Sequence, residues 1–194
     1  MRVPRQTAEI FELLSKKQFI CSNTTDNRIA KLYEVMDDPD NFEALYDYFN
    51  AINFILEKGD EFYYFSRKNE SKADLERKLD IVCRWIDILD FLKTFDINFA
   101  SGYSFTPMQI ATEISVQAVL KNKADSLKNV LKLDDKTPYL DVVNKIIKSL
   151  CDDGFVEEEN EILKSYKVLA SFKYLEELVN IINIPEEIQH EIPE

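Results

Sequence analysis

Residues 53–66, NFILEKGDEFYYFS, contain two short strand-forming segments on either side of the dipeptide Gly59-Asp60. Phe54-Ile55-Leu56 precedes this dipeptide, and Phe62-Tyr63-Tyr64-Phe65 follows it. Aromatic and β-branched residues favour strands, and glycine readily adopts the positive φ of a tight hairpin turn. The stretch therefore predicts a β-hairpin in which Gly59 takes a positive φ.

The sequence before this hairpin predicts a helix, a short strand and two more helices. Apolar residues recur at helical spacing in three segments, residues 5–16, 27–36 and 41–51. Residues 18–22 favour a strand, and the polar cluster Asn23–Asp26 is suited to cap the helix after it. Pro39, after two aspartates, indicates a turn. A helical trio followed by a hairpin is the element order of a winged-helix domain.

Residues 104–184 repeat that order. Thr106-Pro107-Met108-Gln109 predicts a helix start with a capping box. A short helix near 124–132 follows, and a longer helix begins after Thr137-Pro138 and stops at Gly154. Strands at 155–156 and 162–170 are expected around a turn at Glu158-Glu159-Asn160, and Ser171 is expected to cap a last helix.

The predicted fold class is mainly α with small β-hairpins (α+β), as tandem winged-helix domains joined by a long helix. The expected divisions are an N-terminal domain, a connecting helix, a C-terminal domain and an acidic tail, at residues 1–70, 71–103, 104–184 and 185–194.

Residues 72–95 predict the connecting helix, which carries two apolar stripes. The first stripe runs from Leu75 to Leu89 and the second from Ile81 to Phe95. At about 100° per residue, the stripes lie roughly 120° apart. One stripe is enough to dock a helix on its own domain, so the second requires another partner.

Two interpretations of the second stripe stay open. In one, both stripes are buried within the chain, between its two domains. In the other, the second stripe packs against another protomer or a partner peptide, since an exposed apolar patch marks an interface. The interface candidates in the second case are Trp85, Ile88, Leu92, Phe95 and Phe99.

Composition argues against several classes of function. The net charge of −12 disfavours binding of the whole surface to nucleic acid. A single histidine, His190, makes a histidine relay or a histidine zinc site improbable, and no glycine-rich phosphate loop occurs. Three widely spaced cysteines, with Cys21 and Cys83 among apolar neighbours, suggest buried thiols in a reducing compartment. We therefore expect a cytoplasmic protein without catalytic residues, cofactor, metal or membrane span.

Two basic clusters are candidates for contacts with DNA phosphates. Arg67, Lys68 and Lys72 follow the first hairpin, and Lys164, Lys167 and Lys173 follow the second turn. Lysine and arginine bind phosphate without reading sequence, and each cluster is equally compatible with an ordinary solvated face.

Four stretches resemble the MksE subunits of bacterial condensins, relatives of MukE and members of the tandem winged-helix kite proteins. They are residues 19–23, 55–65, 84–91 and 166–172, and the resemblance extends over nearly the whole chain. It implies a nucleoid-associated subunit that forms a homodimer, binds a kleisin and through it an SMC ATPase, and touches DNA. The complex would act in chromosome condensation and segregation or in defence against plasmids.

Two other classes of function remain. A winged-helix DNA-binding transcriptional regulator requires a basic recognition helix, whereas residues 41–51 carry Glu43 and Asp47 without lysine or arginine. An enzyme with a carboxylate-bound metal requires acidic residues to converge from several elements.

Overall fold

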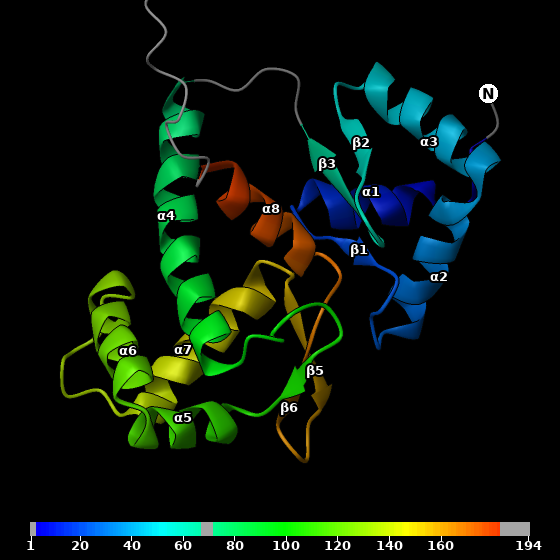
Figure 1. The fold of residues 1–194 in the computed structure, drawn as a ribbon. Coiled ribbons are helices and arrows are strands. Elements are labelled where there is room, and N and C mark those ends of the chain that lie inside the picture. The colour runs from blue at the N-terminus through cyan, green and yellow to red at the C-terminus, as the bar shows by residue number, and fades with distance from the viewer. Residues whose placement is uncertain (1–2, 67–71, 183–194) are drawn as a thin grey trace, which may run out of the picture.

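The computed structural model describes residues 3–66 and 72–182, and within these ranges the side chains outside 72–81 and 180–182 (Figure 1). We call residues 3–66 the N-terminal part and residues 72–182 the C-terminal part. The N-terminal part contains α1 (Thr7–Ser15), β1 (Ile20–Cys21), α2 (Asn27–Asp37), α3 (Pro39–Ala51), β2 (Ile55–Lys58) and β3 (Phe62–Ser66). The C-terminal part contains α4 (Lys72–Phe95), β4 (Ser104–Phe105), α5 (Pro107–Val116), α6 (Ala118–Val130), α7 (Tyr139–Asp152), β5 (Val156–Asn160), β6 (Ser165–Val168) and α8 (Phe172–Ile182).

Each part contains one three-stranded antiparallel sheet with the same strand order. The orders are β1-β3-β2 and β4-β6-β5, so a two-residue strand pairs with the second strand of the hairpin in both. The prediction of a mainly helical chain with small antiparallel hairpins is confirmed. Strand β4 was not predicted, because two residues are too few to show an alternating pattern. The winged-helix assignment and the domain boundaries stay predictions.

Side-chain caps fix the starts of three helices. The carboxylate of Asp26 accepts hydrogen bonds from the backbone N–H groups of residues 28 and 29, and Asp38 does the same for residues 40 and 41. The turn predicted at Pro39 and the two aspartates before it is confirmed as a bend at Asp38 between α2 and α3. Pro39 is the first residue of α3, where proline needs no hydrogen-bond partner. The capping box of Thr106 and Gln109 is confirmed.

The first hairpin forms where predicted, but its glycine has another role. The positive φ of the turn, 68°, belongs to Glu61 and not to Gly59. The Gly59 N–H donates to the Phe62 carbonyl at 2.8 Å, and a Cβ at position 59 would overlap the ring of Phe62. Glycine is required here for close approach of a side chain rather than for its backbone angle.

The second hairpin turns later than predicted. Residues 157–159 lie on β5, which extends to Asn160, and the turn occupies residues 161–164. A β-bulge between Glu158 and Asn160 allows this charged segment to keep pairing with β6. The expected solvated turn at residues 158–160 is therefore wrong.

In the C-terminal part, the start of α6 and the role of Ser171 differ from the prediction, whereas the stop at Gly154 agrees with it. Helix α6 begins at Ala118, earlier than the predicted 124. Gly154 has φ 75° at the end of α7, as expected for a helix stop. The hydroxyl of Ser171, predicted as a cap, donates to the Gly154 carbonyl at 2.5 Å and so joins the start of α8 to the end of α7.

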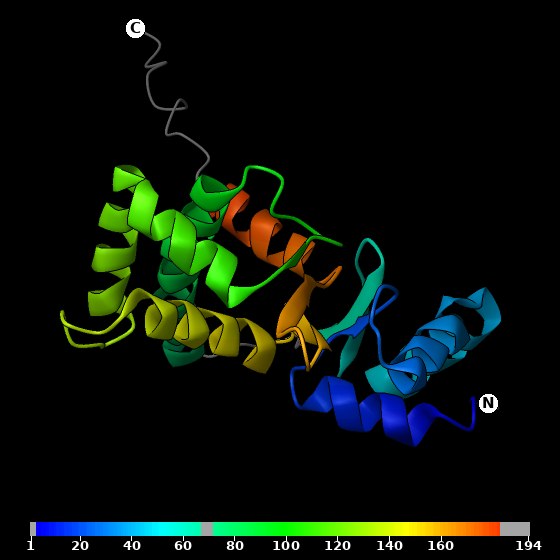
Figure 2. The ribbon, with the colours of Figure 1, turned by 90° about the horizontal axis from the view of Figure 1, so that it is seen from below.

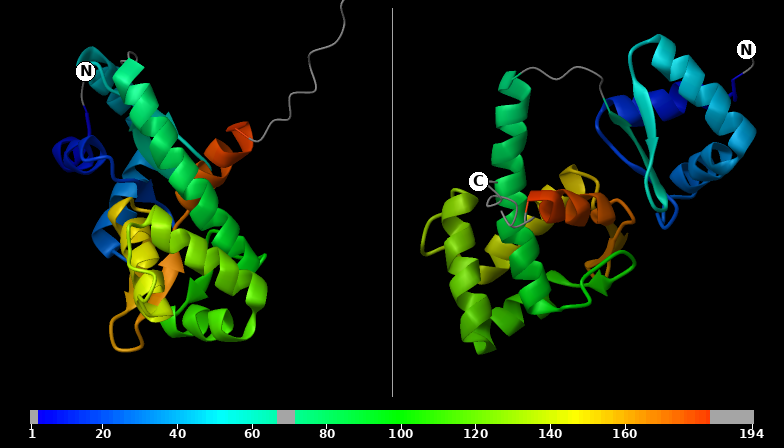
Figure 3. Two further views of the ribbon diagram at one scale, coloured as in Figure 1. Left: turned by 90° about the vertical axis from the view of Figure 1, so that its left-hand side faces the viewer. Right: turned by 45° about the horizontal axis from the view of Figure 1, so that its top comes forward.

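Two main cores lie in the two parts, and α4 belongs to the C-terminal one. Helix α4 packs against α6 and α8 (Figure 3). From Trp85 onward its buried residues join a core formed with α5, α6, α7 and α8. The N-terminal core is centred on Phe49 and Tyr63, which are fully buried.

A third, smaller cluster joins the two parts where their sheets meet (Figure 2). Cys21 and Phe62 from the N-terminal part pack against Leu169 and Ala170. The ring of Phe19 lies 5.5 Å from that of Phe155, centre to centre. Burial of apolar side chains from both parts stabilises their contact.

Polar contacts surround this cluster. The Asn23 amide donates to the Val168 carbonyl at 3.1 Å and accepts from the Ala170 N–H at 2.8 Å. Glu157 accepts from the Thr24 hydroxyl at 2.8 Å and the Thr25 N–H at 2.5 Å. These contacts involve backbone as well as side chains, so they fix the orientation of one part on the other.

Candidate functional site

Four of the five interface candidates lie in the core of the chain. Trp85 is 3% exposed, and Ile88, Leu92 and Phe99 are fully buried. The Trp85 ring packs edge-on against Phe155 at 5.4 Å between centres. Because α4 lies between α6 and α8, these side chains are covered by the chain's own helices. For these four residues, the first of the two open interpretations, burial within the chain, holds, and they form no exposed patch.

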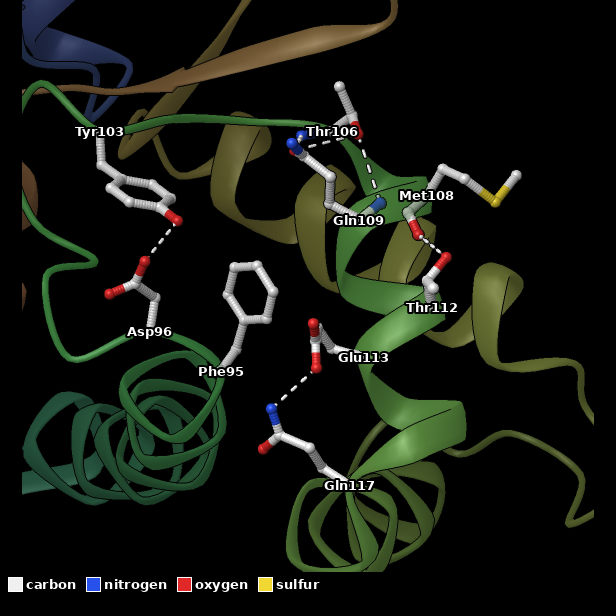
Figure 4. Close-up of a pocket in the computed structure, with 9 residues that line it drawn as sticks. All are labelled: Phe95, Asp96, Tyr103, Thr106, Met108, Gln109, Thr112, Glu113 and Gln117. Atoms are coloured by element: carbon white, nitrogen blue, oxygen red, sulfur yellow. Dashed lines mark hydrogen bonds between the residues drawn. The ribbon is translucent and has the colours of Figure 1, made fainter.

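The fifth candidate, Phe95, is half-buried and borders an open groove of about 520 Å³ (Figure 4). The groove lies between the C-terminal end of α4 and helix α5. Its lining residues are Phe95, Asp96, Tyr103, Thr106, Met108, Gln109, Thr112, Glu113 and Gln117. Two are acidic and none is basic. The groove therefore suits an apolar side chain accompanied by a cationic group.

Hydrogen bonds hold the acidic residues of the groove in place. Asp96 accepts from the Tyr103 hydroxyl at 2.7 Å and from the Asn98 N–H at 2.8 Å. These bonds lower the pKa of Asp96, while burial and the bond to Asp96 raise the pKa of Tyr103 to about 12. Glu113 accepts from the Gln117 amide at 2.8 Å. At neutral pH the Asp96 carboxylate is charged and the Tyr103 hydroxyl is protonated.

Met108 and Val116 extend the apolar surface of α5 beside the groove. Their exposed fractions are 59% and 73%, and Ile97, after α4, is 77% exposed. Sequence reasoning placed interface candidates near the end of α4 and none on α5, which forms the other side of the groove. The groove depends on how α5 crosses the end of α4, which helical periodicity does not specify.

The DNA-contact candidates fall into two groups. Arg67 and Lys68 lie outside the described residues, and Lys72 begins α4 with its side chain outside them. Lys164 pairs with Glu158 at 3.2 Å, and Lys173 pairs with Asp60 at 2.5 Å. These carboxylates reduce the positive potential of the second cluster.

Lys167 is half-buried on β6, where its neighbours across the sheet are Ser104 and Glu157. The structure therefore places an acidic residue beside each of the three lysines of the second cluster.

The metal-ligating and thiol side chains of the described residues are scattered. Among them, no three His, Cys, Asp or Glu side chains are placed to hold a metal ion. Burial raises the pKa of the Cys21 and Cys151 thiols to about 11, so both are protonated at neutral pH. Cys83, expected to be buried, is exposed. None of the described helices has the length and apolar character to cross a membrane. His190 lies outside the described residues.

Comparison with known proteins identifies the family. No curated protein matches the chain. The model of the family described as "Condensin complex protein MksE" matches residues 5–179, which include both sheets, α4 and the groove. Since the match covers most of the 194 residues, the chain belongs to the MksE family of condensin complex proteins.

Proposed function

We propose that this condensin-type subunit is a non-catalytic kite protein, which forms a homodimer and binds the kleisin that connects it to an SMC ATPase. The family match over residues 5–179 is the observation that carries this proposal. In this role the chain supports chromosome condensation and segregation, or defence against plasmids, in the cytoplasm at the nucleoid. The ATPase activity of the complex resides in the SMC partner.

The repeated architecture supports the kite assignment. Both parts contain a helix, a strand, further helices and a hairpin, and both sheets have the strand order first–third–second. This is the arrangement expected for two winged-helix domains in tandem. The contacts of Asn23 and Glu157 hold the two sheets together and would present both to a partner in a fixed orientation.

The groove beside Phe95 is our candidate for the kleisin-binding site, in place of the buried residues of α4. It combines an aromatic wall with the carboxylates of Asp96 and Glu113. An apolar kleisin segment that carries a lysine or arginine would match it, because opposite charges at an interface favour association.

Co-purification with the cognate kleisin tests whether the chain binds kleisin and whether the groove beside Phe95 is the binding site. We expect the wild-type chain to be retained on immobilised kleisin at moderate salt, and the Glu113→Lys variant to bind at least about tenfold more weakly. Glu43→Lys, at an exposed acidic position of α3, is the matched control and should bind as wild type. If the wild-type chain does not bind, the chain is not a kleisin-binding subunit. If Glu113→Lys binds normally, the kleisin site lies elsewhere.

Direct contact with DNA is a separate proposal that now depends chiefly on Arg67, Lys68 and Lys72. Anisotropy titrations with a fluorescent duplex should show salt-sensitive binding that Lys68→Glu weakens. Lys164→Glu should have a smaller effect, because Lys164 is already paired with Glu158. Equal effects of the two variants would contradict the assignment to the first cluster.

A further inference from the structure

The turn of the second hairpin displays two large apolar side chains. Ile162 is 93% exposed, the highest value among the exposed large apolar residues described, and Leu163 is 68% exposed. The turn projects beyond the helices at the lower end of the molecule (Figure 1). Exposed apolar residues at a projecting tip are available to enter a recess in another molecule.

Local hydrogen bonds fix the shape of this tip. The side-chain oxygen of Asn160 accepts from the N–H groups of Ile162 and Leu163, at 3.0 and 2.9 Å. Lys164 takes a positive φ of 51° and pairs with Glu158 at 3.2 Å across the base of the turn. Because the tip is already ordered, binding through it costs less conformational entropy than binding through a loose loop.

The charge around the tip restricts what it can bind. Residues 158–164 carry three carboxylates, on Glu158, Glu159 and Glu161, against the single ammonium group of Lys164. All four side chains are exposed. DNA phosphates and an anionic membrane would be repelled by this charge. A protein recess with lysine or arginine at its rim would be attracted.

A second copy of the chain offers no matching recess in its groove. The groove beside Phe95 is lined by Asp96 and Glu113 and by no basic residue. Insertion of the acidic tip there would place like charges together, which costs free energy at an interface. This groove of a second copy is therefore a poor match for the tip, and charge complementarity favours a recess with a basic rim on a different protein.

We propose that the β5–β6 turn inserts Ile162 and Leu163 into an apolar recess with a basic rim on another subunit of the condensin-type complex. This proposal rests on the proposed function. It gives the chain a second interface, distant in sequence from the groove beside Phe95. The apolar pair provides affinity, and the carboxylates around it select the basic rim.

Photocrosslinking in the assembled complex tests this contact. A benzoylphenylalanine at position 162 of the full chain is irradiated with purified kleisin and SMC subunits, and products are mapped by mass spectrometry. We expect a crosslink to one of these subunits, at apolar residues flanked by lysine or arginine. The control position is Val119, which is 62% exposed on α6. Crosslinks from position 162 only to a second copy of the chain, or no more than from position 119, overturn the proposal.

Affinity measurements give a second, independent test. Each of the two aliphatic side chains would be buried in the contact. Removing one should weaken binding of this chain to the subunit it crosslinks to by about tenfold or more. The Ile162→Ser/Leu163→Ser double variant should therefore bind about 100-fold more weakly, while Val119→Ser changes little. Glu159→Lys/Glu161→Lys should also bind more weakly, with reduced sensitivity to salt. Thermal unfolding of all variants should match wild type, since the side chains are exposed.

The outcomes separate this inference from the proposed function. If the wild-type chain enters the complex and the double serine variant does so with equal affinity, only the tip contact is refuted. If the wild-type chain does not enter the complex, both the proposed function and the tip contact are refuted.

Discussion

Asn23 provides the sharpest test of how the two parts of the chain are held together. Its amide donates to the Val168 carbonyl and accepts from the Ala170 N–H, so one side chain bridges residues separated by more than half of the sequence. Replacement by alanine removes these two hydrogen bonds and the longer one from the amide to the Ser101 hydroxyl, at 3.4 Å. We expect Asn23→Ala to weaken the contact between the parts without changing either core.

The size of the destabilisation by Asn23→Ala depends on which hydrogen bonds the Val168 carbonyl and the Ala170 N–H keep. The Val168 carbonyl also accepts from the Gly102 N–H at 2.8 Å, so it loses one of two bonds, about 1 kcal/mol. The Ala170 N–H lies on a fully buried residue and loses its strong acceptor at 2.8 Å, which leaves only the weakly accepting Cys21 sulfur beside it and costs about 1–3 kcal/mol. The expected loss in free energy of unfolding is therefore about 2–4 kcal/mol. Asn23→Asp keeps the acceptor for Ala170 and should lose less than Asn23→Ala.

Urea unfolding followed by two probes measures this loss. Fluorescence reports on Trp85, the single tryptophan, in the C-terminal core, whereas far-UV circular dichroism reports on both parts. Wild type should unfold in one transition seen equally by both probes. Asn144→Ala, at an exposed position of α7, is the control and should change stability by less than about 0.5 kcal/mol. If Asn23→Ala is as stable as this control, the reasoning about the bridge is refuted.

Three further substitutions test local features of the fold. Gly59→Ala should destabilise the chain by about 1–3 kcal/mol in thermal unfolding, because its Cβ would overlap the Phe62 ring; unchanged stability would show that the turn relaxes freely. Thr106→Ala removes the capping box of α5 and should cost about 0.5–2 kcal/mol in the same assay; no change would mean that tertiary packing alone holds the helix start. Asp37→Asn should reduce the loss of stability on acidification, because hydrogen bonds from Lys58 and the Tyr63 hydroxyl lower the pKa of Asp37 in the folded chain.

The sign of the pH effect follows from that lowered pKa. An aspartate whose pKa is lower when folded stabilises the chain above its unfolded pKa, 3.8, and this stabilisation is lost as pH falls through its folded pKa. Wild type should therefore lose stability below about pH 4 more steeply than Asp37→Asn in urea titrations at pH 7 and pH 3. Asp47→Asn, at an exposed position of α3, is the control. Equal acid sensitivity of wild type and Asp37→Asn would contradict the role of Asp37.

Local signals in the sequence predicted most of the element order. The bounds of α4, residues 72–95, were predicted correctly because its apolar periodicity persists over many turns. The capping box at Thr106 was equally clear, because its residues are adjacent in sequence. The turn at residues 158–160 was misplaced, because three consecutive glutamates resemble a solvated loop and the pairing that holds them in β5 lies on another strand.

The candidate site was less predictable, because it depends on contacts between distant elements. Trp85 and Ile88 belong to a second apolar stripe whose pattern fits burial and exposure equally, and only the placement of α6 and α8 shows that they are covered. The bridge from Asn23 to Ala170 spans most of the chain and has no sequence signature. In contrast, the exposed pair Ile162-Leu163 is visible in the sequence, but it was assigned to a strand and so was not recognised as a tip.

Light scattering coupled to size-exclusion chromatography tests the central claim most directly. The purified chain would be run alone and after mixing with the cognate kleisin at moderate salt. We predict a homodimer in the first run and, in the second, a stable complex that contains both proteins. A chain that elutes as a 22.7 kDa monomer in both runs, with the kleisin in a separate peak, would contradict the account.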